Sequence, residues 1–212
     1  MRRRALLAET LAGLERKPRV LVSASAVGFY GDRGDEAVTE DSPRGEGFLA
    51  DVCEAWEAAT APAEAAGIRV VHVRIGVVLS AQGGALAQLV TPFKLGGGGV
   101  VGSGRQAMPW IALDDLLGVI HRAMWDETLA GPVNATAPAR TTNRDFTRAL
   151  GRVLRRPTIL PLPAAAVRLA FGEMGQRLLL EGAHAAPTRL QAAGHRFDFT
   201  DLEAALRHEL GR

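Results

Sequence analysis

The sequence predicts an α/β protein built around a parallel β-sheet. Between residues 3 and 79, segments with apolar residues at helical spacing alternate with runs rich in valine and isoleucine. These runs are apolar at most positions, which is typical of strands that crossover helices bury on both faces. The chain has 212 residues, enough for a domain of ordinary size with a sizeable core.

The first four elements follow from residue spacing and from the residues that end each segment. A helix is expected over 3–16, where leucines recur at helical spacing before Pro18, and a strand over 19–23. The alanine-rich segment 49–66 predicts a second helix closed by Gly67, and 68–79 predicts a long buried strand. This alternation predicts adjacent parallel strands joined by right-handed crossovers.

The composition changes beyond residue 79. Glycine and glutamine are frequent in 82–88 and glycine in 96–104, so both segments are expected to be loops, where ligands commonly bind. A helix is expected over 114–125, an extended proline-bracketed segment at 157–163, an amphipathic stretch over 164–180, and a helix–turn–helix ending. We therefore divide the chain into 1–75, a substrate-side lobe at 76–155 and a C-terminal helical part at 156–212.

The composition also argues against several classes of protein. There are 25 basic and 23 acidic residues, and their spread along the chain gives no stripe for nucleic acid. The single cysteine, Cys53, can form no internal disulfide and no cysteine-based zinc site, so no metal is expected. No unbroken apolar run of about 20 residues, as a membrane span needs, is present. We expect a cytoplasmic protein with a small-molecule partner.

A formal G-x-G-x-x-G motif lies in the second glycine-rich segment, at Gly97, Gly99 and Gly102. A working dinucleotide motif follows a buried strand and begins a helix, so that the pyrophosphate meets the helix N-terminus. Here the segment after the glycines, 103–109, shows no helix start. We therefore interpret the motif as a flexible loop on the substrate side.

The segment 20–32, VLVSASAVGFYGD, places Ser23 and Ser25 where a predicted strand ends, at the sheet edge that binds ligands. It resembles the extended short-chain dehydrogenase/reductase superfamily, in which a serine-rich strand end supplies the catalytic Ser or Thr. Segments 74–79, 102–106, 110–115 and 131–134 resemble one subgroup, the epimerase family related to nucleoside-diphosphate-sugar epimerases. The tail segments 160–163, 171–174, 187–190 and 193–197 resemble that subgroup's C-terminal domain of unknown function.

This resemblance implies the C-terminal part of a doubly wound, Rossmann-type parallel sheet with a smaller mixed α/β C-terminal lobe. It implies an NAD(P)-dependent epimerase/dehydratase-like oxidoreductase that uses NADP or NAD, with Ser25 as the catalytic hydroxyl. The implied cofactor-binding residues are Ser23, Ile75, Gly76 and Val77. The residues expected to face the substrate are Gln106 and Trp110.

The sequence departs from the superfamily in its catalytic pair. The superfamily uses a Tyr and a Lys four residues apart, because a nearby ammonium lowers the pKa of the phenol. The one tyrosine, Tyr30, has Gly34 four residues on. If Glu57 matches the family's acidic helix residue, Leu49 and Cys53 occupy the Tyr and Lys places. A non-catalytic small-molecule binding or regulatory protein on the same fold is therefore the alternative.

A second departure concerns the front of the chain. A superfamily member begins with a strand and a glycine-rich turn that binds the cofactor pyrophosphate, and nothing of that kind precedes Val20. We expect an N-terminally truncated member that binds NADPH weakly or not at all by itself.

Structural roles compete with functional ones at several of these positions. Ser25 can be a hydrogen-bonding cap on the turn after its strand, and Tyr30 a packed aromatic with its hydroxyl bonded. Cys53, among apolar neighbours, can be a small buried hydrophobe. For Gln106 and Trp110 the sequence leaves a pocket role and a packing role equally open.

Overall fold

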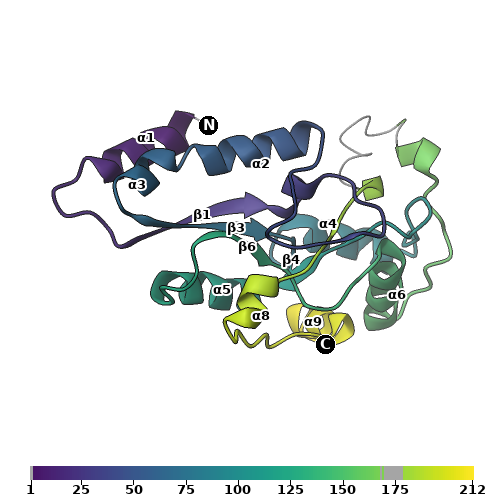
Figure 1. The fold of residues 1–212 in the computed structure, drawn as a ribbon. Coiled ribbons are helices and arrows are strands. Elements are labelled where there is room, and N and C mark those ends of the chain that lie inside the picture. Colours follow the sequence, from purple (N-terminus) through teal and green to yellow (C-terminus); the bar gives the residue numbers. More distant parts are fainter. Residues whose placement is uncertain (1, 168, 170–178) are drawn as a thin grey trace.

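A three-stranded parallel sheet organises the first part of the chain (Figure 1). The computed structural model describes residues 2–167, 169 and 179–212. The strands are β1 (Val20–Ala26), β3 (Arg69–Ile75) and β6 (Gly131–Ala135), in the order β1-β3-β6. β1 and β3 pair along their whole length, so both end at the same edge of the sheet. The predicted adjacent parallel strands are confirmed.

Helices cover both faces of this sheet (Figure 1). α1 (Arg2–Ala12), α2 (Phe48–Ala58) and α3 (Ala61–Ala65) lie on one face, and α5 (Leu113–Trp125) lies on the other. The segment expected as one helix over 49–66 is two helices, because Pro62 in the first turn of α3 has no N–H with which to continue α2. Val71 and Val73 of β3 are fully buried, as a strand covered on both faces requires.

The run expected as one strand over 68–79 is divided between two sheets. β3 ends at Ile75, and β4 (Val77–Leu79) pairs in parallel with β5 (Trp110–Ala112). The chain changes sheets at Gly76, whose N–H donates to the carbonyl of Ala135, and the next N–H donates to the carbonyl of Pro109. A Cβ atom at position 76 would lie only 2.8 Å from that Pro109 oxygen. Glycine is therefore required where the backbone leaves the first sheet.

The first of the two expected loops is instead a helix. α4 (Gly84–Lys94) covers most of 82–88 and buries Leu86 and Phe93 in a hydrophobic core that also contains Leu79 and Trp110. Burial of this apolar face outweighs the poor helix propensity of glycine at its start. The second segment, 96–104, contains no helix, and a Cβ atom on Gly99 would collide with the carbonyl of Leu160. Gly99 thus allows close packing of backbone against backbone.

A second core surrounds β4 and β5. Besides α4, it is covered by α6 (Asn143–Leu154) and α9 (Leu202–Glu209). Its largest fully buried side chains include Trp110, Phe146, Leu79, Leu86, Leu150 and Leu206. Of the stretch expected to be amphipathic, 164–180, residues 168 and 170–178 lie outside the described residues, so that expectation stays a prediction, as do the domain limits.

The C-terminal part is joined to the first sheet by short elements. β2 (Ala37–Val38) pairs in parallel with β7 (His184–Ala185), and α8 (Thr188–Ala192) packs on β6. A single 3₁₀ turn, η1 (Val27–Tyr30), follows β1 directly. Within the part of the chain that the structure describes, no helix has the length and apolar character needed to cross a bilayer.

Candidate functional site

A cavity of about 340 Å³ lies at the carboxyl ends of β1 and β3. Five segments enclose it: the sheet edge with η1 and its following loop, one face of α2, the loop before β5, the first residue of α6, and the chain just before β7. The sheet edge, η1, its following loop and α2 contribute Ala26, Val27, Gly28, Gly31, Glu46, Leu49, Val52, Cys53, Trp56, Ile75, Gly76 and Val77. The later segments contribute Gln106, Ala107, Met108, Pro109, Asn143, Leu179, Glu181, Gly182 and Ala183.

One face of α2 forms an apolar wall of this cavity. Leu49, Val52, Cys53 and Trp56 are three or four residues apart, as neighbours on one helix face are. The two positions matched to the superfamily's Tyr and Lys therefore both reach the cavity, as a leucine and a cysteine. Burial raises the pKa of the Cys53 thiol, which keeps it protonated. The predicted burial of Cys53 is confirmed.

Four of the residues predicted for the site border the cavity. Ile75, Gly76 and Val77 do so at the point where the chain passes from one sheet to the other. Gln106 lines the opposite side, where its side-chain Nε2 donates to the carbonyls of Val101 and Leu179, at 2.9 and 2.8 Å. Gln106 thus ties together two chain segments at the cavity wall. That these four residues bind a ligand stays a prediction.

The expectation that Trp110 faces a substrate is wrong. Its side chain is 1% exposed and belongs to the second core, and its indole Nε1 donates to the hydroxyl of Thr141 at 2.9 Å. Trp110 begins β5, and pairing of that strand with β4 turns the side chain into the core. The tryptophan that does line the cavity is Trp56 on α2.

Ser23 and Ser25 are not among the described residues that line the cavity. The buried hydroxyl of Ser25 donates to the Glu57 carboxylate at 2.8 Å, and the hydroxyl of Ser23 accepts a hydrogen bond from Arg4 of α1 at 3.0 Å. Both side chains therefore point toward the face of the sheet that α1 and α2 cover. Because the Ser25 proton is already donated, the structure places this serine in a packing network. Its catalytic role stays a prediction.

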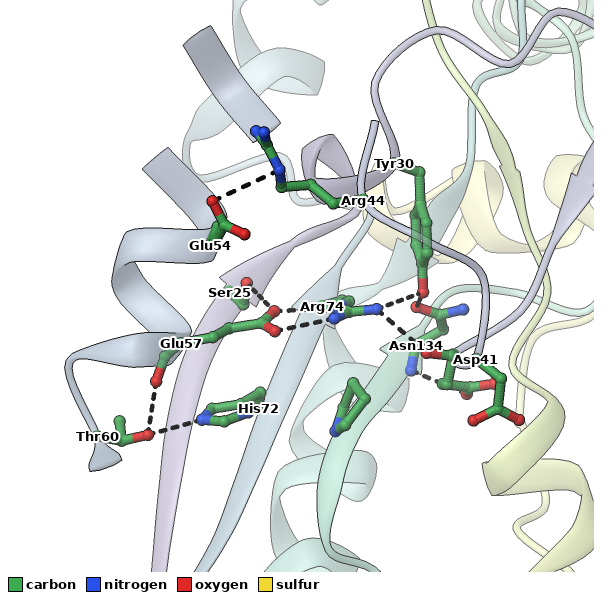
Figure 2. Close-up of polar contacts among 12 residues, drawn as sticks. Ser25, Tyr30, Asp41, Arg44, Glu54, Glu57, Thr60, His72, Arg74 and Asn134 are labelled. Carbon is green, nitrogen blue, oxygen red and sulfur yellow. Dashed lines mark hydrogen bonds and ion pairs between the residues drawn. The ribbon is translucent and has the colours of Figure 1, made fainter. Parts of the chain in front are cut away.

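Beside the cavity lies a buried polar network centred on Arg74 of β3 (Figure 2). The guanidinium of Arg74 makes two hydrogen bonds to the carboxylate of Glu57, at 2.9 and 2.8 Å, and a third to the hydroxyl of Tyr30 at 3.0 Å. Tyr30 in turn donates to the Asn134 side chain at 2.7 Å. Tyr30 is fully buried with its hydroxyl bonded, as the packing interpretation predicts.

The ion pair decides the charge states in this network. Burial alone would raise the pKa of Glu57, but hydrogen bonds from Arg74 and Ser25 outweigh it and hold this pKa below its usual range. Burial raises the pKa of Tyr30, and the contacts from Arg74 only partly oppose that rise. Glu57 and Arg74 are thus a charged pair, whereas Tyr30 is a neutral phenol at physiological pH.

The network continues into the C-terminal part through Glu40. Its carboxylate is 3% exposed and accepts the backbone N–H groups of Asn134 and Arg189, at 3.0 and 3.3 Å, and the hydroxyl of Thr188. The Arg189 guanidinium binds the carboxylate of Asp41, the residue that follows Glu40, at 2.8 Å. The loop that carries Glu40 and Asp41 is therefore fastened to α8.

Comparisons with known proteins agree with this geometry. A family model described as a domain of unknown function, DUF1731, matches residues 162–209. An epimerase family protein of Mycobacterium bovis is 48% identical over 186 residues, which are 88% of this chain and 62% of that protein. The epimerase family protein SDR39U1 of Bos taurus is 41% identical over 204 residues, 95% of this chain and 69% of the bovine protein. The chain belongs to the epimerase family. The resemblance seen in the motifs is confirmed.

A solved structure of this epimerase family matches the whole chain. The crystal structure of human SDR39U1 (isoform 2) with NADPH aligns with a TM-score of 0.87 and 33% identity, over 100% of this chain and 72% of the human one. The parallel α/β fold is thereby confirmed as that of the family. The present chain spans about 62% of the length of the mycobacterial relatives.

Sequence reasoning named Ser25, Tyr30 and Glu57 but did not predict the polar network that they form with Arg74. Arg74 was noted only as part of a motif, although a charged residue inside a valine-rich strand is itself a sign of a buried partner. Glu40 gave no comparable sign, and Asn134 stands out only as part of the segment 131–134 that carries the family resemblance. Both residues find their partners across the fold.

Proposed function

We propose that this chain forms the nicotinamide- and substrate-facing part of an NAD(P)-dependent, epimerase-like oxidoreductase. The observation that carries the proposal is the cavity at the carboxyl ends of β1 and β3, where ligands of parallel α/β sheets bind. The NADPH in the structure of human SDR39U1 supports a nicotinamide cofactor for the family.

The residues at the sheet edge fit a nicotinamide ring. The ring is flat, and Gly76 lies at the sheet edge among the residues that line the cavity. Ile75 and Val77 would border the ring, while Leu49 and Trp56 would keep water away from it. When bound, the cofactor supplies a hydride at the nicotinamide C4.

The chain must also hold the proton that accompanies hydride transfer. Tyr30 does not serve here, because its hydroxyl already donates to Asn134 and accepts from Arg74 away from the cavity. Among the described lining residues, the groups able to carry a proton are the Cys53 thiol and the carboxyl groups of Glu46 and Glu181.

Tight cofactor binding needs a pyrophosphate site as well. In the described residues, no glycine-rich turn leads from a strand of the three-stranded sheet directly into an α-helix. We therefore expect this chain by itself to bind NADPH weakly or not at all, since the helix N-terminus that would hold the pyrophosphate is not among its described elements.

The alternative is a non-catalytic member that binds a small molecule or nucleotide. One observation favours it: Leu49 stands at the cavity wall in the position matched to the catalytic Tyr, and its side chain can transfer no proton.

Trp56 provides the test, because an indole at the cavity wall reports an adjoining nicotinamide. NADPH should quench tryptophan fluorescence at high concentration and raise the melting temperature by mass action. The Trp56→Phe variant should lose the quenching and keep the thermal shift. Loss of nicotinamide absorbance with a carbonyl compound would support the oxidoreductase, and binding without turnover would support the alternative. Quenching that persists in Trp56→Phe would contradict the placement of the nicotinamide.

A further inference from the structure

The cavity has a chemical character that the family name does not suggest. Its walls are apolar on three sides: Leu49 and Trp56 from α2, Ile75 and Val77 from the sheet edge, and Met108 and Pro109 from the loop before β5. Apolar walls favour an apolar ligand, because each apolar area removed from water contributes to binding.

The polar groups of the cavity are few and mostly engaged. The Gln106 Nε2 already donates to two main-chain carbonyls, and the side-chain Oδ1 of Asn143 accepts the backbone N–H of Val101 at 2.9 Å. A pyranose ring carries several hydroxyls, and each one buried without a partner costs about 1–3 kcal/mol. Besides these two amides, the polar side chains of the described walls are the carboxylates of Glu46 and Glu181, so the partners for a sugar ring are few.

The charges at the cavity are of the wrong sign for a nucleotide sugar. Its charged lining residues, among those described, are Glu46 and Glu181, and none is an arginine, lysine or histidine. α2 begins at the cavity, and Glu46 lies just before it, whereas Asp51 in its first turn is paired with Arg44. A diphosphate at the start of α2 would therefore meet the carboxylate of Glu46, and the described lining offers it no cationic side chain.

Size points in the same direction. The volume of 340 Å³ lies near the lower end of the range of about 300–1,000 Å³ for small-molecule sites. A nucleotide sugar would have to lie largely outside such a cavity.

We propose that the cavity binds an uncharged, mainly apolar carbonyl compound or its alcohol, and not a nucleotide sugar. This inference rests on the proposed oxidoreductase function for the choice of a carbonyl group, while the apolar character comes from the cavity walls.

The test compares octan-2-one with UDP-glucose by isothermal titration calorimetry on the purified 212-residue protein, with and without NADPH. Octan-2-one should bind at least about tenfold more tightly, because the described walls offer few partners to the sugar and no cationic side chain to the diphosphate. The Leu49→Gln variant places an amide in the apolar wall and should weaken octan-2-one binding about tenfold. Leu117→Gln makes the same change on α5 at a residue that is 55% exposed and not among the described lining residues, so it should leave the affinity unchanged.

Thermal melts of both variants establish that they are folded. UDP-glucose binding as tightly as octan-2-one, or an unchanged octan-2-one affinity in folded Leu49→Gln, would overturn the inference. NADPH that binds but is not oxidised in the presence of octan-2-one would count against the proposed function alone, since the comparison of the two other ligands does not require the cofactor.

Discussion

The cavity and the polar network centred on Arg74 meet along α2 and differ in chemical character. Toward the cavity, α2 presents Leu49, Cys53 and Trp56. Toward the sheet it presents Glu57, which forms the ion pair with Arg74. In the polar network nearly every side-chain polar atom has a partner inside the protein (Figure 2). The groups with the greatest capacity for proton transfer therefore hold elements together, while the surface open to a ligand is mostly apolar.

This difference teaches that a motif position and a functional position can separate. Ser25 and Tyr30 lie in the segment that most resembles the superfamily's catalytic strand, yet both belong to the polar network. Their hydroxyls are fixed by Glu57 and Asn134, which leaves no free donor toward the cavity. The network and the cavity should consequently respond to substitution in different ways.

The largest expected effect comes from breaking the buried ion pair. Arg74→Met leaves Glu57 charged and half-buried without its partner, so the free energy of unfolding should fall by about 3–5 kcal/mol. Urea denaturation measures it. The matched control is the double variant Arg74→Met/Glu57→Leu, which removes both charges and should recover much of the loss. Equal losses in the single and double variants would show that the pair is not the source of the effect.

Two tryptophans sharpen the comparison between core and cavity. Trp110→Phe removes the hydrogen bond to Thr141 and leaves that buried hydroxyl without its donor, at a cost of about 1–3 kcal/mol. Trp56→Phe at the cavity wall should cost less than about 1 kcal/mol, mainly through its contact with Arg4. Thermal melts of the two variants compare them directly. A larger loss for Trp56→Phe would reverse the assignment of these two residues.

Gln106 has both a cavity-lining and a structural position, because it lines the cavity and also ties two chain segments together. Gln106→Ala removes both hydrogen bonds to main-chain carbonyls and should lower the free energy of unfolding by about 1 kcal/mol. It should also weaken octan-2-one binding, since the cavity wall at Leu179 loses its support. The same substitution at the exposed Gln82 is the control and should change neither quantity. Ligand affinity that is unchanged in Gln106→Ala would assign this residue to packing alone.

The smallest effect concerns pH. Burial lowers the pKa of His72, despite the nearby carboxylates of Glu57 and Glu64. The unfolded chain takes up the histidine proton near pH 6.5, whereas the folded protein does so only at lower pH, so the unfolded state binds more protons between the two pKa values. The contribution of His72 to the free energy of unfolding should therefore have its full value above about pH 6.5. It should fall as the pH decreases from there through the lower pKa of the folded protein.

His72→Gln tests this pH dependence. Its unfolding free energy should depend less on pH between about pH 7.5 and about pH 5.5 than that of the unsubstituted protein. Part of the dependence should remain, because burial also lowers the pKa values of His184 and His195. Identical pH profiles in the two proteins would show that His72 does not titrate in this window.

The sequence by itself determined the class of the fold and the location of the site edge. Valine-rich runs such as 69–75 form strands wherever they are buried on both faces, and a serine-rich strand end followed by glycines marks the ligand-binding edge of a parallel sheet. These properties depend on local composition and spacing. The parallel pairing of β1 with β3 followed from them, whereas Ile75, Gly76 and Val77 were implied as site residues by the family resemblance.

Only the tertiary structure decided what each side chain at that edge does. Gly76 ends β3 because the backbone of Pro109 lies against it, and Trp110 is buried because β5 pairs with β4. Arg74 and Glu40 find partners 17 to 149 residues away along the chain. A contact between residues so distant in sequence leaves no periodic pattern in either segment, so its partners become apparent only when the chain is folded.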